Sequence, residues 1–340
     1  MAAAAAASAT VGYDRMKEVK EFDNSKIGVK GLSDSGIATI PKFFVHPPET
    51  LSDLKSSSTC AGIPVIDLSG LKSHLDRPKI VEQIREAART WGFFQVINHG
   101  VPVSVLDETI AAIKAFHEQP TEAATWLDSL QVWMSPVPAK VEDIPAVCRR
   151  EVVEWDMHAK MVAETVMELL CEGLGLDSGK LKELGYTDTR NFLGHCYPYC
   201  PQPDLTLGIT SHTDYGMLTV LLQNQVEGLQ VKHGHEWVDV KPLHGGLIIN
   251  IGDSLQIISN DEYTSAEHRV LANSSEKPRI SIVEFFHADN RDVSSIHGPL
   301  PELLSAEKPA VYRNFTMGEF IENFLTKGLD SKSLVQKLKL

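Results

Sequence analysis

The chain lacks the cysteine pattern of a disulfide scaffold or a zinc ribbon. Its 5 cysteines are an odd number in 340 residues and include no Cys-x-x-Cys pair. Such usage favours a reducing compartment. No apolar run reaches the roughly 18 residues of a membrane-spanning helix. The alanine-rich start, Met1–Val11, has no basic region and is predicted to be a disordered tail, not a signal peptide. We therefore expect a cytoplasmic protein that does not associate with membranes.

An excess of basic residues is also missing. Lys and Arg together number 32, against 45 Asp and Glu, so the formal net charge is −13 at pH 7. Binding a nucleic acid backbone needs clustered Lys and Arg, so we expect no nucleic acid partner. The sequence also has no Gly-x-x-x-x-Gly-Lys-Ser/Thr loop for nucleotide phosphates.

Helical periodicity is present in the N-terminal half of the chain. Apolar residues recur at the spacing of one helix face in three segments, for which we predict helices: Ile80–Ala88 with Pro78 in its first turn, Leu106–Phe116, and Val147–Leu174. Two shorter segments, rich in β-branched or aromatic residues, are predicted strands: Ile63–Ile66 and Trp91–Asn98.

The pattern changes after residue 190, where short apolar runs alternate with turn residues. Six such runs are predicted strands: Leu218–Leu222, Gly228–Val231, Glu236–Val240, Leu247–Ile251, His268–Ala272 and Ile280–Phe286. Short strands that alternate regularly with turn residues favour a β-sandwich or barrel. Met317–Phe324 again suggests a helix. The fold class is therefore predicted to be α+β, a helical N-terminal half packed on a C-terminal β core.

Candidate metal-ligating side chains lie close together in Ser211-His212-Thr213-Asp214. Side chains two residues apart in an extended segment point to the same face, so His212 and Asp214 can approach one ion. A lone His-x-Asp is common by chance, and a third ligand is needed. His268, at the start of another predicted strand, can supply it. Two imidazoles and one carboxylate on one face form the facial triad of a non-haem Fe(II) site, with positions left open for other ligands.

A second pair of polar residues follows His268 on the next predicted strand. Arg279 and Ser281 share one face of it. A guanidinium pairs with a carboxylate through two hydrogen bonds, and a hydroxyl can add a third. Taken alone, Arg279 could equally be an ordinary surface arginine. Beside the triad, the pair indicates a site for the far carboxylate of a dicarboxylate co-substrate.

Taken together, these motifs resemble the plant 2-oxoglutarate- and Fe(II)-dependent dioxygenases of specialised metabolism. The segments that carry the resemblance are Ile63–Asp67, Trp91–Gly100, Tyr197–Pro203, His212–Asp214, Gly228–Val231, Asn250–Asp253, His268–Val270 and Arg279–Ser281. Phe22–Leu32 further resembles the N-terminal signature of the homologues of aminocyclopropane-carboxylate oxidase, a subgroup with alkaloid and benzoxazinoid hydroxylases. The true ethylene-forming enzymes start closer to the strand at Ile63, so that activity is disfavoured.

The resemblance implies a double-stranded β-helix (jelly roll) core with flanking helices. Four segments are expected: an N-terminal extension at 1–60, a mostly helical region at 61–185, the jelly roll at 186–300 and a helical tail at 301–340. By the same resemblance, His212, Asp214 and His268 bind iron and form the catalytic centre, while Arg279, Ser281 and Tyr197 hold 2-oxoglutarate. Phe285 matches a position that often faces the organic substrate.

The implied reaction couples oxidative decarboxylation of 2-oxoglutarate by O2 to hydroxylation, desaturation or demethylation of a small organic molecule. Fe(II) and 2-oxoglutarate are the expected cofactor and co-substrate, and ascorbate is a further candidate. We expect a monomer.

One region departs from the pattern of the family. Between Phe116 and Ser135 the chain looks shorter than in similar enzymes, and we predict that the strand-forming residues that extend the main sheet and wall the substrate pocket are missing. A pocket opened in this way would admit water to the reactive centre. Two alternatives therefore stay open: a non-catalytic jelly roll that binds a small ligand, and a zinc hydrolase, although the latter leaves Arg279 and Ser281 unexplained.

Overall fold

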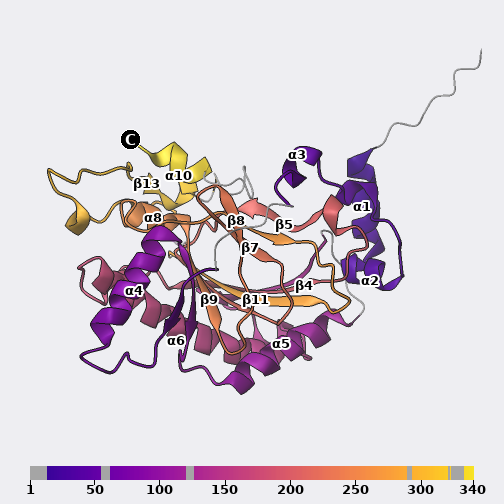
Figure 1. Ribbon diagram of the computed structural model, residues 1–340, viewed down its shortest axis with the longest axis horizontal. Coiled ribbons are helices and arrows are strands. Elements are labelled where there is room, and N and C mark those ends of the chain that lie inside the picture. The colour runs from indigo at the N-terminus through magenta and orange to yellow at the C-terminus, as the bar shows by residue number, and fades with distance from the viewer. Residues whose placement is uncertain (1–13, 55–61, 120–125, 289–292, 321, 323–332) are drawn as a thin grey trace, which may run out of the picture.

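The computed structural model describes residues 14–54, 62–119, 126–288, 293–320, 322 and 333–340. Two β-sheets are stacked face to face, and helices cover the outer face of the larger one (Figure 1). The predicted tail at Met1–Val11 lies outside the described residues.

The larger sheet has seven strands in the order β1-β2-β9-β6-β11-β4-β3. Their bounds are β1 Val65–Asp67, β2 Phe93–Ile97, β3 Asp128–Ser135, β4 Thr189–Tyr197, β6 Leu218–Gln223, β9 Leu247–Ile251 and β11 Arg279–His287. The second sheet has the order β5-β10-β7-β8, with β5 Leu207–His212, β7 Leu229–His233, β8 Glu236–Asp239 and β10 His268–Leu271. A small third sheet pairs β12, Ile296–His297, with β13, Phe315–Thr316. All the predicted strands are present, within a few residues at their ends.

The three predicted helices are α4, Arg77–Thr90, α5, Val103–His117, and α6, Arg149–Gly173, which pack on the larger sheet. Pro78 lies in the first turn of α4, as predicted. The other α-helices are α1 Arg15–Ser25, α2 Gly28–Asp34, α3 Pro48–Leu51, α7 Lys180–Glu183, α8 Asp253–Ile258 and α10 Ser333–Leu338. Single 3-10 turns form η1 Lys42–Phe44, η2 Val141–Asp143, η3 Pro203–Leu205 and η4 Pro301–Leu303. Of the predicted helix at Met317–Phe324, residues 317–320 are helical and most of the rest lies outside the described residues.

The alternation of side chains along β11 separates two interiors. Residues at even positions pack against the helices, in the main apolar core: Ile280, Ile282 and Phe286. Residues at odd positions turn into the space between the two sheets: Arg279, Ser281, Val283 and Phe285. A strand has a side-chain period of two, so one strand contributes to the core under the helices and also places Arg279 and Ser281 between the sheets. The architecture is the expected α+β jelly roll with flanking helices.

The predicted loss of a sheet-extending strand between Phe116 and Ser135 is wrong. β3 pairs antiparallel with β4 and forms the edge of the larger sheet. Leu130 and Val132 are buried on its helix side, whereas Gln131 and Trp133, which follow them in turn, are exposed. This is the alternation of a half-buried edge strand. It was not recognised in the sequence because two tryptophans and an aspartate occur in the same short run.

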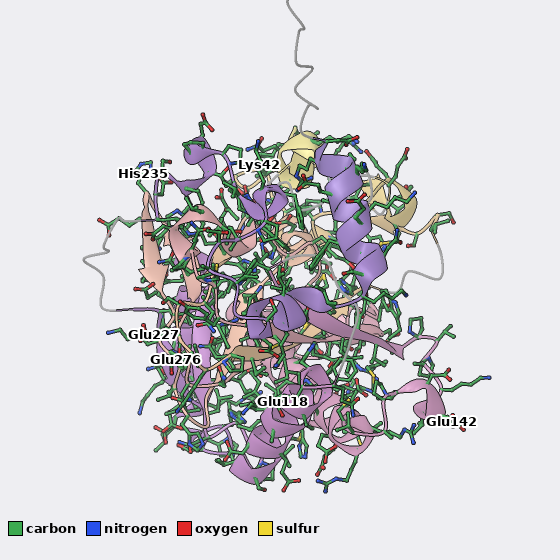
Figure 2. All side chains as sticks on the ribbon, turned by 90° about the vertical axis from the view of Figure 1, so that its right-hand side faces the viewer. Lys42, Glu118, Glu142, Glu227, His235 and Glu276 are labelled. Atoms are coloured by element: carbon green, nitrogen blue, oxygen red, sulfur yellow. The ribbon has the colours of Figure 1, made fainter. Side chains whose placement is uncertain are left out.

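The N-terminal extension is held on the core through Asp128, the first residue of β3. Its carboxylate accepts hydrogen bonds from the backbone N–H groups of Val29, at 3.0 Å, and Lys30, at 2.9 Å, in the first turn of α2. Gly28 has a φ of +62° and fits closely, because a Cβ there would come 3.0 Å from an Asp128 oxygen. Figure 2 shows α1 and α2 lying in front of the strands of the core, with Lys42 of η1 labelled beside the upper end of α1. A carboxylate on β3 thus caps a helix that lies almost 100 residues earlier in the chain.

We predict that Asp128→Ala destabilises the protein by about 1–3 kcal/mol, because it leaves two N–H groups of α2 without an acceptor. Urea denaturation measures this change, and limited proteolysis would show faster cleavage between residues 30 and 46. The matched control is Asp34→Ala, which removes the exposed ion pair of Asp34 with the side chain of Lys30 and should cost less than about 0.5 kcal/mol. Equal losses in the two variants would contradict the anchoring role of Asp128.

Candidate metal and co-substrate site

His212, Asp214 and His268 meet between the two sheets. His212 ends β5 and His268 begins β10, and the two are direct cross-strand partners. Oδ1 of Asp214 lies 3.7 Å from Nε2 of His212 and 3.6 Å from Nε2 of His268. All three residues are buried, and their candidate ligand atoms lie within 4.8 Å of one another. They form the only group of three or more potential metal-ligating residues with this closeness in the described part of the chain.

Hydrogen bonds aim each of these side chains at a common point. Nδ1 of His212 lies 2.8 Å from the carbonyl oxygen of Thr210, and Nδ1 of His268 lies 3.2 Å from that of Ala266. Since a carbonyl only accepts, each Nδ1 carries a proton, and each Nε2 is the ring nitrogen left to ligate a metal.

The carboxylate of Asp214 is oriented in the same way. Its Oδ2 accepts hydrogen bonds from Oγ1 of Thr219, at 2.6 Å, and from Nδ2 of Asn250, at 2.7 Å. Oδ1 is thereby left facing the two imidazoles.

The protonation states also suit a divalent cation. Burial, and next the neighbouring His268, lower the pKa of His212 to about 4. Burial raises the pKa of Asp214, but the two histidines and the two hydrogen bonds outweigh it and hold this pKa below its usual value. At neutral pH, His212 is therefore neutral and Asp214 is charged, as metal ligation requires.

Arg279 is buried close to the triad, with 1% of its surface exposed. Its partners are neutral: Nη2 donates to Oε1 of Gln223 at 2.8 Å, and Nη1 to Oγ of Ser281 at 3.3 Å. No described carboxylate pairs with it, and its Nε has no hydrogen-bond partner. A buried guanidinium stays charged and is costly without an anion. This site therefore fits the far carboxylate of a dicarboxylate such as 2-oxoglutarate.

Cross-strand pairing places the other groups around Arg279. Tyr197 on β4 is its direct partner, and the Arg279 Cζ atom lies 5.0 Å from the centre of the Tyr197 ring. Ser281 pairs with His195 on β4 and with Gln223 on β6. All seven residues predicted for the site line one small buried cavity, Phe285 among them. The structure thus brings together every residue that the sequence nominated.

Sequence reasoning missed the groups that position these residues. Gln223, Thr219 and Asn250 were given no role, although Gln223 and Thr219 are polar residues on one face of an otherwise apolar strand. Polar residues that interrupt an apolar strand in this way could have indicated groups that face the site.

A second cavity of about 410 Å³ adjoins the first and shares His195, Ile209, His212 and Phe285 with it. Its outer wall comes from the N-terminal extension, through α1 and η1, and from Trp126 just before β3. The Trp126 ring packs edge-on against Phe44, with ring centroids 5.0 Å apart. The predicted open side of the substrate pocket is therefore covered, because a segment distant in sequence folds over it.

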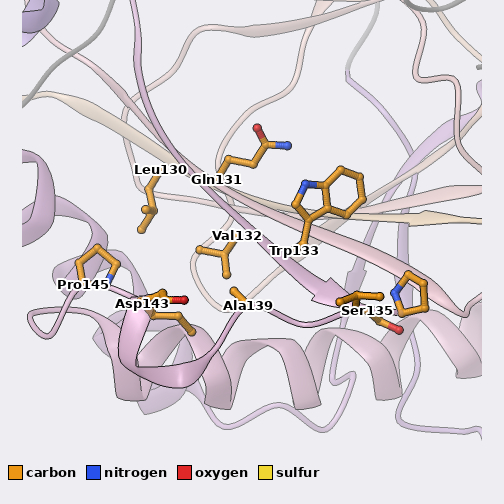
Figure 3. Close-up of a pocket in the computed structure, with 11 residues that line it drawn as sticks. Leu130, Gln131, Val132, Trp133, Ser135, Ala139, Asp143 and Pro145 are labelled. Atoms are coloured by element: carbon orange, nitrogen blue, oxygen red, sulfur yellow. The ribbon is translucent and has the colours of Figure 1, made fainter.

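A larger cavity, of about 650 Å³, lies at the outer edge of the sheet (Figure 3). Residues of β3 and the following loop line it, from Leu130 to Pro145. It shares no lining residue with the two cavities around the triad, and none of the predicted site residues reaches it. Its size alone therefore does not make it the reactive site.

The fold and this site define an oxygenase that uses Fe(II) and 2-oxoglutarate. Residues 188–288 match the model of the 2OG-Fe(II) oxygenase superfamily, and residues 63–128 match that of the N-terminal region of non-haem dioxygenases in morphine synthesis. The chain belongs to the 2OG-Fe(II) oxygenase superfamily. It is a dioxygenase with Fe(II) as cofactor and 2-oxoglutarate as co-substrate, and the non-catalytic alternative is not favoured.

Curated relatives confirm the predicted subgroup. The chain is 44% identical to 1-aminocyclopropane-1-carboxylate oxidase homolog 4 of Arabidopsis thaliana, with 94% of this chain and 97% of the relative covered. It is 40% identical to a homolog from Solanum lycopersicum, with 96% and 98% covered. The alignment to homolog 6 of Arabidopsis thaliana runs over 360 positions, more than the 340 residues of this chain. That relative therefore has residues without a counterpart here.

Solved structures share the fold. The crystal structure of JOX2 in complex with 2OG, Fe, and JA has a TM-score of 0.79 at 29% identity, and covers 92% of this chain and 97% of that one. The structure of the dioxygenase for auxin oxidation in rice has a TM-score of 0.72 at 26% identity, and covers 82% and 100%. A small-molecule substrate accordingly suits this chain. None of the described helices is long and apolar enough to cross a bilayer.

We predict that Thr219→Val weakens binding of a divalent metal about tenfold, because Asp214 loses one of the two hydrogen bonds that orient it. Anaerobic titration with Co(II), followed by its absorbance, measures the affinity. Thr165→Val, which removes a hydroxyl bonded to the Met161 carbonyl on α6, is the matched control and should bind metal like the wild type. Unchanged affinity in Thr219→Val would show that the hydroxyl does not support the metal ligands.

Proposed function

We propose that His212, Asp214 and His268 hold Fe(II), that Arg279, Ser281 and Tyr197 hold the far carboxylate of 2-oxoglutarate, and that Phe285 faces the organic substrate. The observation that carries this proposal is the pairing of two incomplete sites in one cavity. One is a three-ligand group with its lone pairs aimed at a common point, and the other is a buried guanidinium without an anion.

The proposed reaction is hydroxylation of a small plant metabolite. A C–H bond of the substrate, O2 and 2-oxoglutarate give a C–OH bond, succinate and CO2, with one oxygen atom entering succinate and the other the product. Bound Fe(II) supplies the activation of O2, and desaturation or demethylation can follow from the same chemistry.

The contribution of the chain itself is positioning and exclusion of water. Arg279 and Ser281 fix one end of the co-substrate in the cavity, 11 and 13 residues after His268 in sequence. His195 lines both cavities, and its Nδ1 is hydrogen-bonded to Oγ of Ser129 at 2.8 Å. Burial, followed by the charge of Arg279, lowers the pKa of His195 to about 3. His195 is thus an uncharged side chain that lies between the proposed co-substrate and substrate positions.

We further propose a cytoplasmic enzyme that works as a monomer. The proposed site takes all its residues from one chain, and the four described cysteines are buried free thiols, as suits a reducing compartment.

The activity is tested by succinate release under Fe(II), 2-oxoglutarate and O2, with candidate substrates and with ascorbate present or absent. We expect release that requires all three reagents and is lost in Asp214→Ala. Retained metal binding without succinate above background, with any substrate, would overturn the catalytic proposal.

We also predict that Arg279→Leu weakens 2-oxoglutarate binding about 100-fold or more, since a carboxylate loses its buried cationic partner. Arg279→Lys keeps the charge without the planar fork and should lose about tenfold. Calorimetric titration with the Mn(II)-loaded protein measures both, and metal affinity should stay at the wild-type value. If metal affinity falls in parallel, Arg279 supports the fold of the site and not the co-substrate.

A further inference from the structure

The cavity that adjoins the metal site has an uneven distribution of charge. Its walls are mostly apolar, with aromatic and aliphatic side chains from four segments: Phe43, Phe44, Trp126, Leu127, Leu193 and Phe285. No described Asp or Glu lines it, although the chain carries 45 acidic residues and a net charge of −13. Among the residues that the structure describes, Arg15 is the only Lys or Arg in the lining. The described lining of the cavity is thus mostly apolar and carries one fixed positive charge, that of Arg15.

Arg15 stands at the solvent side of this cavity. It is exposed and begins α1, whereas the buried His212 marks the inner end. Its Nη2 donates to the carbonyl oxygen of Phe43 at 3.4 Å, which ties the side chain to η1 in the cavity wall. No ion pair with a described carboxylate is formed. The guanidinium therefore has donors left for an acceptor on a bound molecule.

His46 adds a second polar group to the same end. It lies two residues after η1 and is half-buried. Burial, and next the charge of Arg15, lower the pKa of His46. A neutral imidazole beside the guanidinium offers a hydrogen bond without competing for an anion.

We propose that the organic substrate is an apolar carboxylic acid, with its carboxylate at Arg15 and its apolar body along the aromatic wall toward His212. This inference rests on the proposed function and assigns the substrate class of the same site. A volume of about 410 Å³ is in the range of small-molecule sites. The overall negative charge of the protein repels acids, so a preference for them must come from a local cation.

The test compares three apolar acids with their methyl esters: octanoic, phenylbutanoic and indolepropionic acid. Binding is measured by calorimetry to the full-length protein loaded with Mn(II) and saturated with 2-oxoglutarate, so that Arg279 is already occupied. For at least one pair we expect the acid to bind about five- to tenfold more tightly than its ester, because a charge-assisted hydrogen bond at a partly exposed site gives this much discrimination.

Variants of Arg15 locate the preference. Arg15→Ala should reduce the acid-to-ester ratio to about one, and Arg15→Lys should keep part of it. The control Lys17→Ala removes an exposed charge from the same helix, where Lys17 pairs with Glu21, and should leave the ratio unchanged. An unaltered ester affinity in Arg15→Ala would show that α1 still forms the wall.

Three results would overturn the inference: esters that bind as well as acids, no binding of either, or an acid preference that survives Arg15→Ala. An equal loss in Lys17→Ala would assign the preference to the general field of α1 and would also overturn it. The affinity for 2-oxoglutarate, measured before any acid is added, separates this failure from failure of the proposed function. Normal 2-oxoglutarate binding without an acid preference defeats only the substrate class.

Discussion

A buried positive charge without a protein counter-ion is the constraint around which this site is built. Arg279 is enclosed between the two sheets and contacts only neutral groups, the amide of Gln223, the hydroxyl of Ser281 and the ring of Tyr197. Desolvation of a guanidinium is expensive, so the cavity is most stable when an anion enters it. The nearby triad includes the negative charge of Asp214, which the neutral imidazole of His212 does not balance. A cation at the triad would balance Asp214, and a dicarboxylate between that cation and Arg279 would balance the guanidinium.

The second requirement is a closed space next to these charges. The jelly roll provides the floor, but the outer wall comes from residues 15–46, far from the core in sequence. Asp128 connects the two by capping α2, and Trp126 packs on Phe44 immediately beside it. Edge strand and N-terminal extension thus act as one unit. This arrangement covers the side of the cavity that the sequence predicted to be open.

Several features could be predicted from the sequence because they depend on local periodicity. The helices α4, α5 and α6 follow from apolar spacing, and β11 from a run of β-branched and aromatic residues. The triad and the Arg279–Ser281 pair follow from spacing of two in extended segments, supported by the resemblance to a family. β3 was missed because its alternation covers only a few positions and stands in a short run with two tryptophans and an aspartate. The roles of Gln223, Thr219 and Asn250 were missed because hydrogen bonds across strands depend on register.

The sequence by itself indicated the residues proposed to carry the chemistry, through side-chain type, a period of two and the resemblance to a family. It also determined the fold class, because the balance of helical and strand periodicity is written along the chain. Only the tertiary structure decided what surrounds that chemistry. Strand register brought Gln223 to Arg279 and Asn250 to Asp214. The docking of α2 on Asp128 places the N-terminal extension, with Arg15, over the side of the cavity that the sequence predicted to be open. These contacts join residues from 36 to 99 positions apart, and no local sequence pattern predicts them.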